Sequence, residues 1–92
     1  MRSAWQWLEV GVRLLGHGDL AAAKAAFRQA LETGAWAEAA YNLGWVLDAQ
    51  GRYAEAAAVL RQAVELDPWW EDAAVNLRRA EMLAGQPNGV GA

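Results

Sequence analysis

Few residues in this chain could carry out covalent or acid–base chemistry. The 92-residue sequence has no cysteine and one histidine, His17, which stands alone in a Gly-His-Gly-Asp segment. A lone imidazole there is better explained as a group near a helix C-terminus, where its cation gains from the helix dipole. The sequence shows no nucleophile paired with a base, no set of metal ligands and no phosphate-binding loop. It therefore predicts a protein that is not an enzyme, with no catalytic residue, no metal and no cofactor.

Charge and hydropathy narrow the range of partners. Eight basic and 11 acidic residues give a net charge of −3, whereas nucleic-acid binding depends on clustered Lys and Arg. No run reaches the roughly 18 apolar residues of a membrane span, because Glu9 and Arg13 interrupt the N-terminal apolar stretch. We expect no nucleic acid, no membrane contact and a cytoplasmic location. The excess of Arg over Lys is typical of a GC-rich bacterial genome.

The strongest pattern in the sequence is a repeat of 33 residues. A repeat of this length predicts stacked helical hairpins, each of which buries its apolar face against its neighbours. Residues 10–32 and 43–65 agree at ten places, namely Gly11/Gly44, Leu14/Leu47, Gly18/Gly51, Ala21/Ala54, Ala23/Ala56, Ala25/Ala58, Arg28/Arg61, Gln29/Gln62, Ala30/Ala63 and Glu32/Glu65. Function is therefore expected on the surface of the stack.

Start and stop signals divide the chain into five helices. Ser3 with Gln6 forms a capping-box pattern, and Asp19 is placed to cap the second helix. Glycines at 18, 34, 51 and 85 are placed to end helices. Pro68 fits the first turn of a helix and predicts the start of the last one. The expected helices cover about residues 4–16, 20–33, 36–50, 52–66 and 68–84, the last running through Trp69.

The helices are expected to form one domain over residues 1–85. It consists of a repeat at 4–36, a repeat at 37–70 and a capping helix at 71–84. Residues 86–92 are rich in Pro, Asn and Gly and are expected to form a disordered tail.

The repeated residues resemble the tetratricopeptide repeat family, whose hairpin follows the pattern W-x2-L-G-x2-Y, a turn Gly, A-x3-F, an Ala and a Pro over roughly 34 residues. The first repeat matches with Trp7, Val10, Gly11, Leu14, Gly18, Ala23, Phe27 and Ala30. The second matches with Ala40, Leu43, Gly44, Leu47, Gly51, Ala56, Leu60, Ala63 and Pro68. The resemblance implies an all-α fold of antiparallel helix-turn-helix repeats, stacked as a short right-handed α-solenoid of five helices.

The third repeat departs from this pattern. It begins with Ala74 and Leu77, but Arg78 and Glu81 replace the expected Gly and Leu. Polar residues at these positions predict a capping helix with nothing stacked after it.

Packing considerations agree with the resemblance. Glycine in a helix interior costs about 1 kcal/mol relative to alanine, so Gly11 and Gly44 predict close approach of two helices. Trp7 shares a helix face with Val10 and Leu14 and is expected in the core, packed against Phe27. Trp36, Trp69 and Trp70 lie at helix starts and are expected to pack between helices or to form N-terminal staples.

In this family the first helices of successive hairpins line a concave groove that receives a partner segment. Carried over to this chain, the groove would be lined by Trp5, Leu8, Val12 and Leu15, by Glu38, Tyr41, Asn42, Trp45 and Asp48, and by Asp72, Val75, Asn76, Arg79 and Met82. Most of these residues are apolar, which fits a peptide or an amphipathic helix with anchors at i, i+3 or i+4 and i+7. Glu38, Asp48 and Asp72 favour a partner that carries Lys or Arg.

Two alternatives remain at this point. Some family members grip a C-terminal carboxylate. Asn42, Asn76 and Arg79 could contribute to such a clamp here, but Leu8 and Val12 occupy the places where a cation and an amide would be needed, so the clamp is incomplete. The apolar face of the first helix could instead pair with a second copy of the chain, or a hairpin could swap between copies. Trp5 and Trp45 could contact a partner or pack on each other across the groove.

Overall fold

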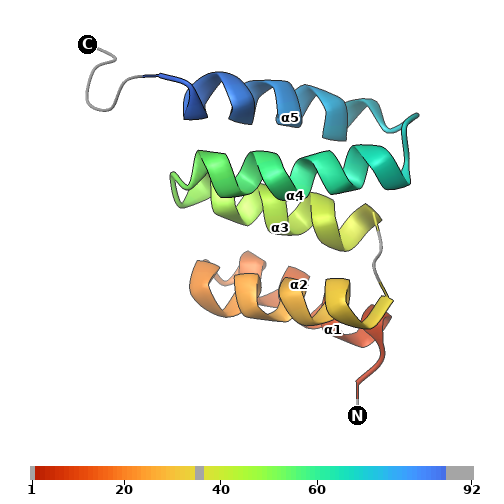
Figure 1. Ribbon diagram of the computed structural model, residues 1–92. Coiled ribbons are helices and arrows are strands. Elements are labelled where there is room, and N and C mark those ends of the chain that lie inside the picture. The colour runs from red at the N-terminus through yellow and green to blue at the C-terminus, as the bar shows by residue number, and fades with distance from the viewer. Residues whose placement is uncertain (1, 35–36, 87–92) are drawn as a thin grey trace.

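The computed structural model describes residues 2–34 and 37–86. Within these ranges it contains five α-helices and no β-strand: α1 (Ala4–Gly16), α2 (Leu20–Gly34), α3 (Ala37–Ala49), α4 (Tyr53–Leu66) and α5 (Glu71–Ala84). α1 packs against α2 and α3 against α4 as two hairpins, and α5 packs against α4 and touches α3 (Figure 1). The predicted all-α stack of hairpins is confirmed.

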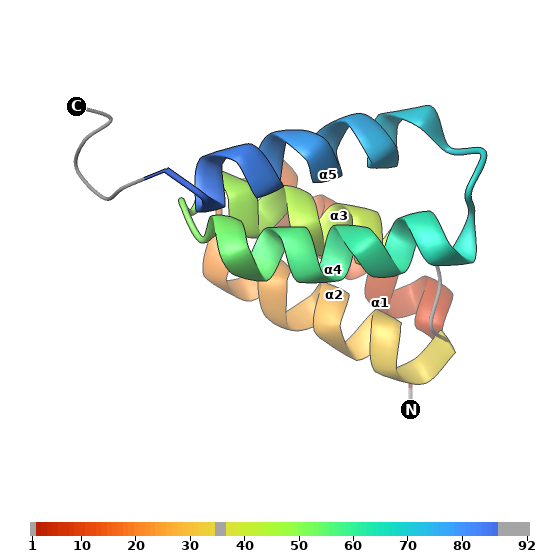
Figure 2. The same cartoon turned by 45° about the horizontal axis from the view of Figure 1, so that its top comes forward.

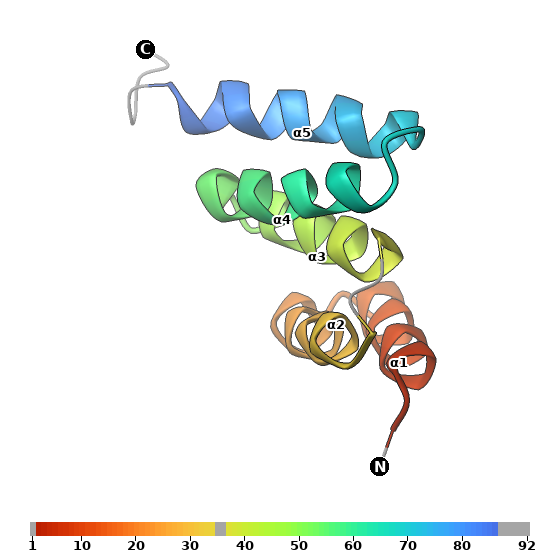
Figure 3. The same ribbon diagram turned by 45° about the vertical axis from the view of Figure 1, so that its right-hand side comes forward.

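The hairpins form successive layers. Figure 1 shows α1 and α2 at the bottom, α3 and α4 above them, and α5 at the top. Figure 3 looks nearly along the bottom layer and separates α1 from α2, and Figure 2 shows α5 lying over α3 and α4. α2 packs against α3, and this contact joins the two hairpins.

Each hairpin turns at a glycine in the left-handed region of the backbone. Gly18 has a φ of 80° and Gly51 a φ of 77°, and only glycine adopts this conformation at little cost. The residue after each glycine donates its backbone N–H to a helix carbonyl five residues earlier. These hydrogen bonds run from Asp19 to Leu14 (3.0 Å) and from Arg52 to Leu47 (2.8 Å). The two turns therefore share one structure.

Side-chain caps fix the starts of the first two helices. The backbone N–H of Gln6 donates to Ser3 Oγ at 3.2 Å, and the backbone N–H of Ser3 donates to Gln6 Oε1 at 2.8 Å. The backbone N–H of Ala22 donates to Asp19 Oδ1 at 3.1 Å. Both predicted caps are confirmed.

Two interior glycines let the helices of each hairpin approach closely. A Cβ atom built on Gly11 would lie 2.4 Å from Phe27 Cε1, and one built on Gly44 would lie 2.5 Å from Leu60 Cγ. Real Cβ atoms essentially never come this near to another heavy atom. The prediction of close approach at Gly11 and Gly44 is confirmed, and the same glycine-to-large-residue contact holds both hairpins.

The core joins both hairpins and the last helix. Its largest fully buried side chains are Phe27, Leu43, Val46, Leu47 and Leu60. Alanines complete it where helices cross, and Ala23, Ala30, Ala39, Ala40, Ala56, Ala63, Ala73 and Ala80 are all 0% exposed. Trp7 packs against this core but is only half-buried, so the prediction of a core tryptophan holds in part.

A seam of apolar residues attaches each later layer to the one before it. In α3 the seam is Ala39, Leu43 and Val46, and 34 residues further on, in α5, it is Ala73, Leu77 and Ala80. The corresponding residues of α1, 33 positions before those of α3, are Gln6, Val10 and Arg13, of which Gln6 and Arg13 are exposed. The first layer therefore presents a polar end surface.

The opposite end of the stack is also polar. Arg78 and Glu81 of α5 stand where Gly44 and Leu47 of α3 face α4, and both are exposed. Glu81 Oε2 accepts a hydrogen bond from Arg61 Nη2 at 2.9 Å. These contacts fit the predicted capping role of the last helix.

The predicted start of the last helix at Pro68 is wrong. α5 begins at Glu71, with Trp70 as its N-cap in an extended conformation (φ −82°, ψ 97°). The backbone N–H of Trp69 donates to Asp67 Oδ1 at 3.3 Å, and that of Trp70 donates to the Asp67 carbonyl at 3.1 Å. A turn centred on Pro68 therefore precedes the helix, and 71–84 is the correct range.

The other predicted boundaries match the observed ones or differ by one residue. α2 includes Gly34, α3 ends at Ala49 instead of Gln50, and Arg52 is the N-cap of α4 instead of its first residue. The prediction for Trp36, and that for the tail at 86–92 beyond Gln86, fall outside the described residues.

Candidate functional site

The predicted groove residues of α1 form an apolar surface with one buried member. Trp5 is 52% exposed and Val12 is 51% exposed, but Leu8 is only 7% exposed and belongs to the core. The buried residues of α1 are Ala4, Leu8 and Gly11, which recur at i, i+4 and i+7 and so share one helix face. The expectation that Leu8 lies open in the groove is therefore wrong, and we expect Leu8→Glu to destabilise the domain.

A hollow marks the exposed part of this surface. It measures about 350 Å³ and is lined by Trp5, Gln6, Leu8, Glu9 and Val12. Leu15, also predicted to line the groove, is half-buried and packs against the core. The open apolar surface of α1 consequently centres on Trp5 and Val12.

Tyr41 connects α3 with α5. Its ring lies 4.4 Å from that of Trp70, centroid to centroid, and its hydroxyl oxygen accepts a hydrogen bond from Asn76 Nδ2 at 3.3 Å. Trp70 therefore packs between helices, as predicted. Because its ring and its hydroxyl group both make contacts within the chain, Tyr41 is held in one position.

A second polar contact joins the same two helices further along. Arg79 Nη1 of α5 donates to Asp48 Oδ2 of α3, forming an ion pair. Asn76 and Arg79, two of the three residues considered for gripping a carboxylate, are thus engaged by Tyr41 and Asp48. The third, Asn42, is half-buried on α3. These contacts weaken the carboxylate-clamp alternative further.

The remaining predicted residues are open to solvent. Trp45 is 45% exposed, Val75 is 52% exposed and Met82 is 63% exposed. Glu38 and Asp72 are exposed in the first turns of α3 and α5. The structure therefore brings the α3 and α5 candidates together through two side-chain contacts, Asn76 with Tyr41 and Arg79 with Asp48. The α1 candidates lie at the equivalent positions of the repeat.

We name the resulting surface the odd-helix face. It comprises Trp5, Glu9, Val12, Glu38, Tyr41, Asn42, Trp45, Asp48, Asp72, Val75, Asn76, Arg79 and Met82. Among the described residues, seven large apolar side chains are exposed, and five of them (Trp5, Val12, Trp45, Val75 and Met82) belong to this face. Most of the exposed large apolar side chains thus belong to the odd-numbered helices α1, α3 and α5.

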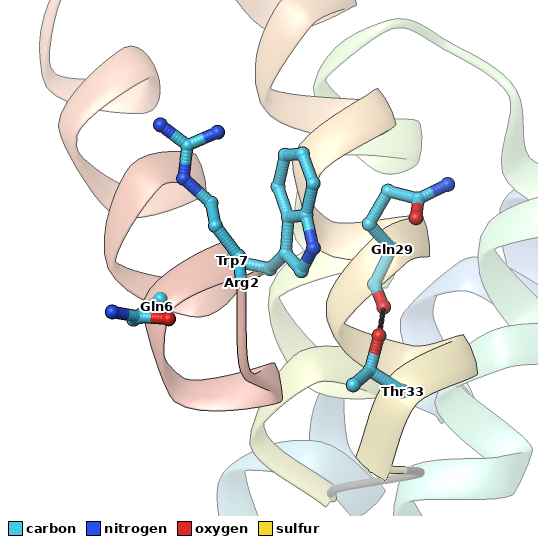
Figure 4. A pocket seen from close by; sticks show the side chains of 5 residues that line it. All are labelled: Arg2, Gln6, Trp7, Gln29 and Thr33. Atoms are coloured by element: carbon cyan, nitrogen blue, oxygen red, sulfur yellow. Dashed lines mark hydrogen bonds between the residues drawn. The ribbon is translucent and has the colours of Figure 1, made fainter.

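Sequence reasoning missed a second hollow at the N-terminal end. It measures about 710 Å³ and is lined by Arg2, Gln6, Trp7, Gln29 and Thr33 (Figure 4). The Arg2 guanidinium carbon lies 5.0 Å from the centre of the Trp7 ring, a cation–π distance. The sign of this hollow in the sequence is that Arg2 and Trp7 stand on either side of the start of the first helix. None of its lining residues belongs to the odd-helix face, although Gln6 also lines the hollow beside Trp5 and Val12.

Sequence reasoning also misplaced Trp69. It was expected to pack between helices or to form an N-terminal staple, but it is 93% exposed in the turn before α5. The Asp67–Trp69 hydrogen bond directs the chain around the turn without burying this ring. Trp69 therefore lies outside both the core and the odd-helix face.

Neither a metal site nor a membrane span is found in the part of the chain that the structure describes. Across residues 2–34 and 37–86 there is no group of three or more His, Cys, Asp or Glu placed to hold a metal ion. No helix within these ranges has the length and hydropathy needed to cross a bilayer.

Comparison with known families agrees with this geometry. Residues 9–68 match the family described as tetratricopeptide repeat. The matched range includes both glycine contacts, Gly11 with Phe27 and Gly44 with Leu60. A comparison with curated proteins gives no match.

Proposed function

This chain belongs to the tetratricopeptide repeat family, and from that premise we propose that it is a noncatalytic scaffold that binds a partner peptide or amphipathic helix on the odd-helix face. Repeats of this family generally mediate protein–protein interactions. The observation that carries the proposal is the concentration of exposed apolar side chains on this face, with Trp5 and Trp45 as its largest members.

Physical arguments favour a partner for this surface. Monomeric proteins seldom expose an apolar patch larger than about 300 to 600 Å² unless it has a function. Tryptophan is enriched among the residues that dominate binding energy at interfaces. Since Tyr41 is already fixed by Trp70 and Asn76, part of the face loses little conformational freedom on binding.

A peptide selection tests the proposal. Peptides would be selected for binding from a random display library, and their Kd values measured against the native domain and against the Trp45→Ala and Val12→Ala variants. We expect each substitution to weaken binding, by about tenfold for Trp45→Ala, which corresponds to about 1.4 kcal/mol. Circular dichroism should show unchanged helicity, because Trp45 and Val12 are about half exposed.

Trp69→Ala is the matched control. It also removes an exposed tryptophan, but one outside the odd-helix face. The selected peptides could instead bind the Trp45→Ala and Val12→Ala variants as tightly as the native domain and fail to bind the Trp69→Ala variant. That result would place the binding site at the turn before α5 and contradict the proposal.

Self-association through α1 is the alternative function, and the exposure of Trp5 and Val12 favours it. Sedimentation equilibrium, measured from micromolar to millimolar protein, distinguishes self-association from a monomer that binds another partner. A constant mass of 10.0 kDa removes self-association. A mass that rises with concentration, and no longer rises in a Val12→Asp variant, supports it.

A further inference from the structure

The charges of the odd-helix face are strongly unequal. Of the 11 acidic and eight basic residues in the chain, the face holds four acidic residues, Glu9, Glu38, Asp48 and Asp72, and one basic residue, Arg79. Seven residues of each sign are left for the rest of the chain. The net charge of −3 therefore resides on the same face as the exposed apolar side chains.

The one cation of this face is already neutralised. Arg79 is paired with Asp48 across α3 and α5. Glu9, Glu38 and Asp72 are exposed, and none of them forms an ion pair with another residue of the described ranges. Arg13 follows Glu9 by four residues on α1 and so lies near it on the helix surface, but the two side chains form no ion pair in the described ranges.

The free carboxylates lie beside the exposed apolar residues. Glu9 lines the same hollow as Trp5 and Val12. Asp72 precedes Val75 by three residues, and Glu38 precedes Trp45 by seven, so each pair shares a helix face. A bound segment that covers the apolar residues would bring its own flanking side chains close to these acids.

A helix-dipole explanation accounts for only part of this pattern. Glu38 and Asp72 lie in the first turns of α3 and α5, where negative charge is favourable to the helix. Glu9 lies in the middle of α1, where the dipole gives it no such advantage. Because removing Glu38 or Asp72 can also change helix stability, a binding test of these acids needs a stability measurement beside it.

We propose that the partner is a cationic amphipathic helix, whose apolar anchors cover Trp5, Val12 and Trp45 and whose Lys or Arg side chains pair with Glu9, Glu38 and Asp72. This proposal rests on the proposed function. Long Lys and Arg side chains suit the arrangement, because their aliphatic stems cover apolar surface while their charged ends reach carboxylates. Such complementarity acts on specificity and association rate as well as affinity.

Two model peptides test the charge preference. Both would be amphipathic helices of about 18 residues, about 27 Å long, with Leu on one face and either Lys or Glu on the other. Binding would be measured by isothermal titration calorimetry and by NMR shifts of the Trp5 and Trp45 indole N–H groups. We expect the Leu–Lys peptide to bind about tenfold more tightly than the Leu–Glu peptide at low ionic strength, and the difference to shrink as salt screens the charges.

Two matched double variants locate the effect. Glu9→Gln with Glu38→Gln removes two charges from the odd-helix face, and Glu32→Gln with Glu65→Gln removes two exposed charges from α2 and α4. The first variant should lose most of the preference for the Leu–Lys peptide, and the second should keep it. Thermal unfolding of both variants shows whether any loss comes from reduced stability.

The outcomes distinguish this proposal from the one on which it rests. If both peptides bind equally and Trp45→Ala weakens both, the binding face stands and the cationic partner is excluded. If the two double variants lose the preference equally, the attraction is nonspecific and the pairing is excluded. If neither peptide binds or shifts the indole signals, both the cationic partner and the proposed function are excluded.

Discussion

At the scale of single residues, the contacts of Gly11 and Gly44 decide how near the helices of a hairpin can lie. Each glycine faces a large side chain of the second helix, Phe27 or Leu60, at a distance that excludes a Cβ atom. Alanine is otherwise the better helix former by about 1 kcal/mol. The cost of glycine is thus offset by burial of the facing side chain, and this explains why the glycine recurs with the repeat.

Gly44→Ala should destabilise the domain by about 1 to 3 kcal/mol, because the added methyl group overpacks the contact with Leu60. Gly16→Ala is the control, since a Cβ there meets nothing within 4 Å, and it should leave stability unchanged or slightly raised. Urea unfolding followed by circular dichroism measures both. Equal effects of the two substitutions would show that helix propensity, and not the contact with Leu60, decides the outcome.

At the scale of helices and turns, the attachment of α5 depends on the two tryptophans that precede it. Trp70 is half-buried against Tyr41, whereas Trp69 points into solvent at 93% exposure. The same residue type, at adjacent positions, therefore has a packing role in one case and none in the other.

Trp70→Ala should lower the free energy of unfolding by about 1 to 3 kcal/mol, because it removes the ring that stacks on Tyr41 and fixes the start of α5. Trp69→Ala should change it by less than about 0.5 kcal/mol, as expected for an exposed side chain. Thermal melts of the two variants provide the comparison. A larger loss for Trp69→Ala would mean that the turn before α5 is packed differently.

Much of the helix pattern could be predicted from the sequence because the signals are local. Gly18, Gly51, Ser3 and Asp19 specify turns and caps through their own backbone and side-chain chemistry. The predicted start of α5 is wrong because the turn before it is fixed by contacts with Asp67 and Tyr41, which lie outside the helix. No sequence pattern within residues 68–71 indicates those contacts.

The candidate site was predictable only as a set of helix faces. The resemblance to the family placed Trp5, Val12 and Trp45 on one surface, and their exposure agrees with it. Spacing could not show that Leu8 turns toward the core beside Ala4 and Gly11. Nor could it show that Arg79 is paired with Asp48, since that contact depends on how α5 is seated on α3.

At the scale of the whole molecule, the stack is closed at both ends. Gln6 and Arg13 replace the apolar seam that α3 and α5 use, and Arg78 and Glu81 replace the residues that would receive another helix. Because polar groups are costly to bury without partners, neither end favours a further layer.

Restoring the seam tests this interpretation. The double variant Gln6→Ala with Arg13→Val gives α1 the residues that α3 buries, Ala39 and Val46. We expect the variant to associate at concentrations where the native chain does not, measured as a concentration-dependent mass in sedimentation equilibrium. A variant whose mass equals that of the native chain at every concentration would show that Gln6 and Arg13 do not limit stacking.

Closure at both ends also sets a limit on recognition. The odd-helix face is built from three helices only, α1, α3 and α5. A ligand on it can place only a few side chains against the domain, so discrimination between competing ligands would depend on a handful of positions. Single substitutions in the ligand should therefore alter selectivity more sharply than they would on a longer array.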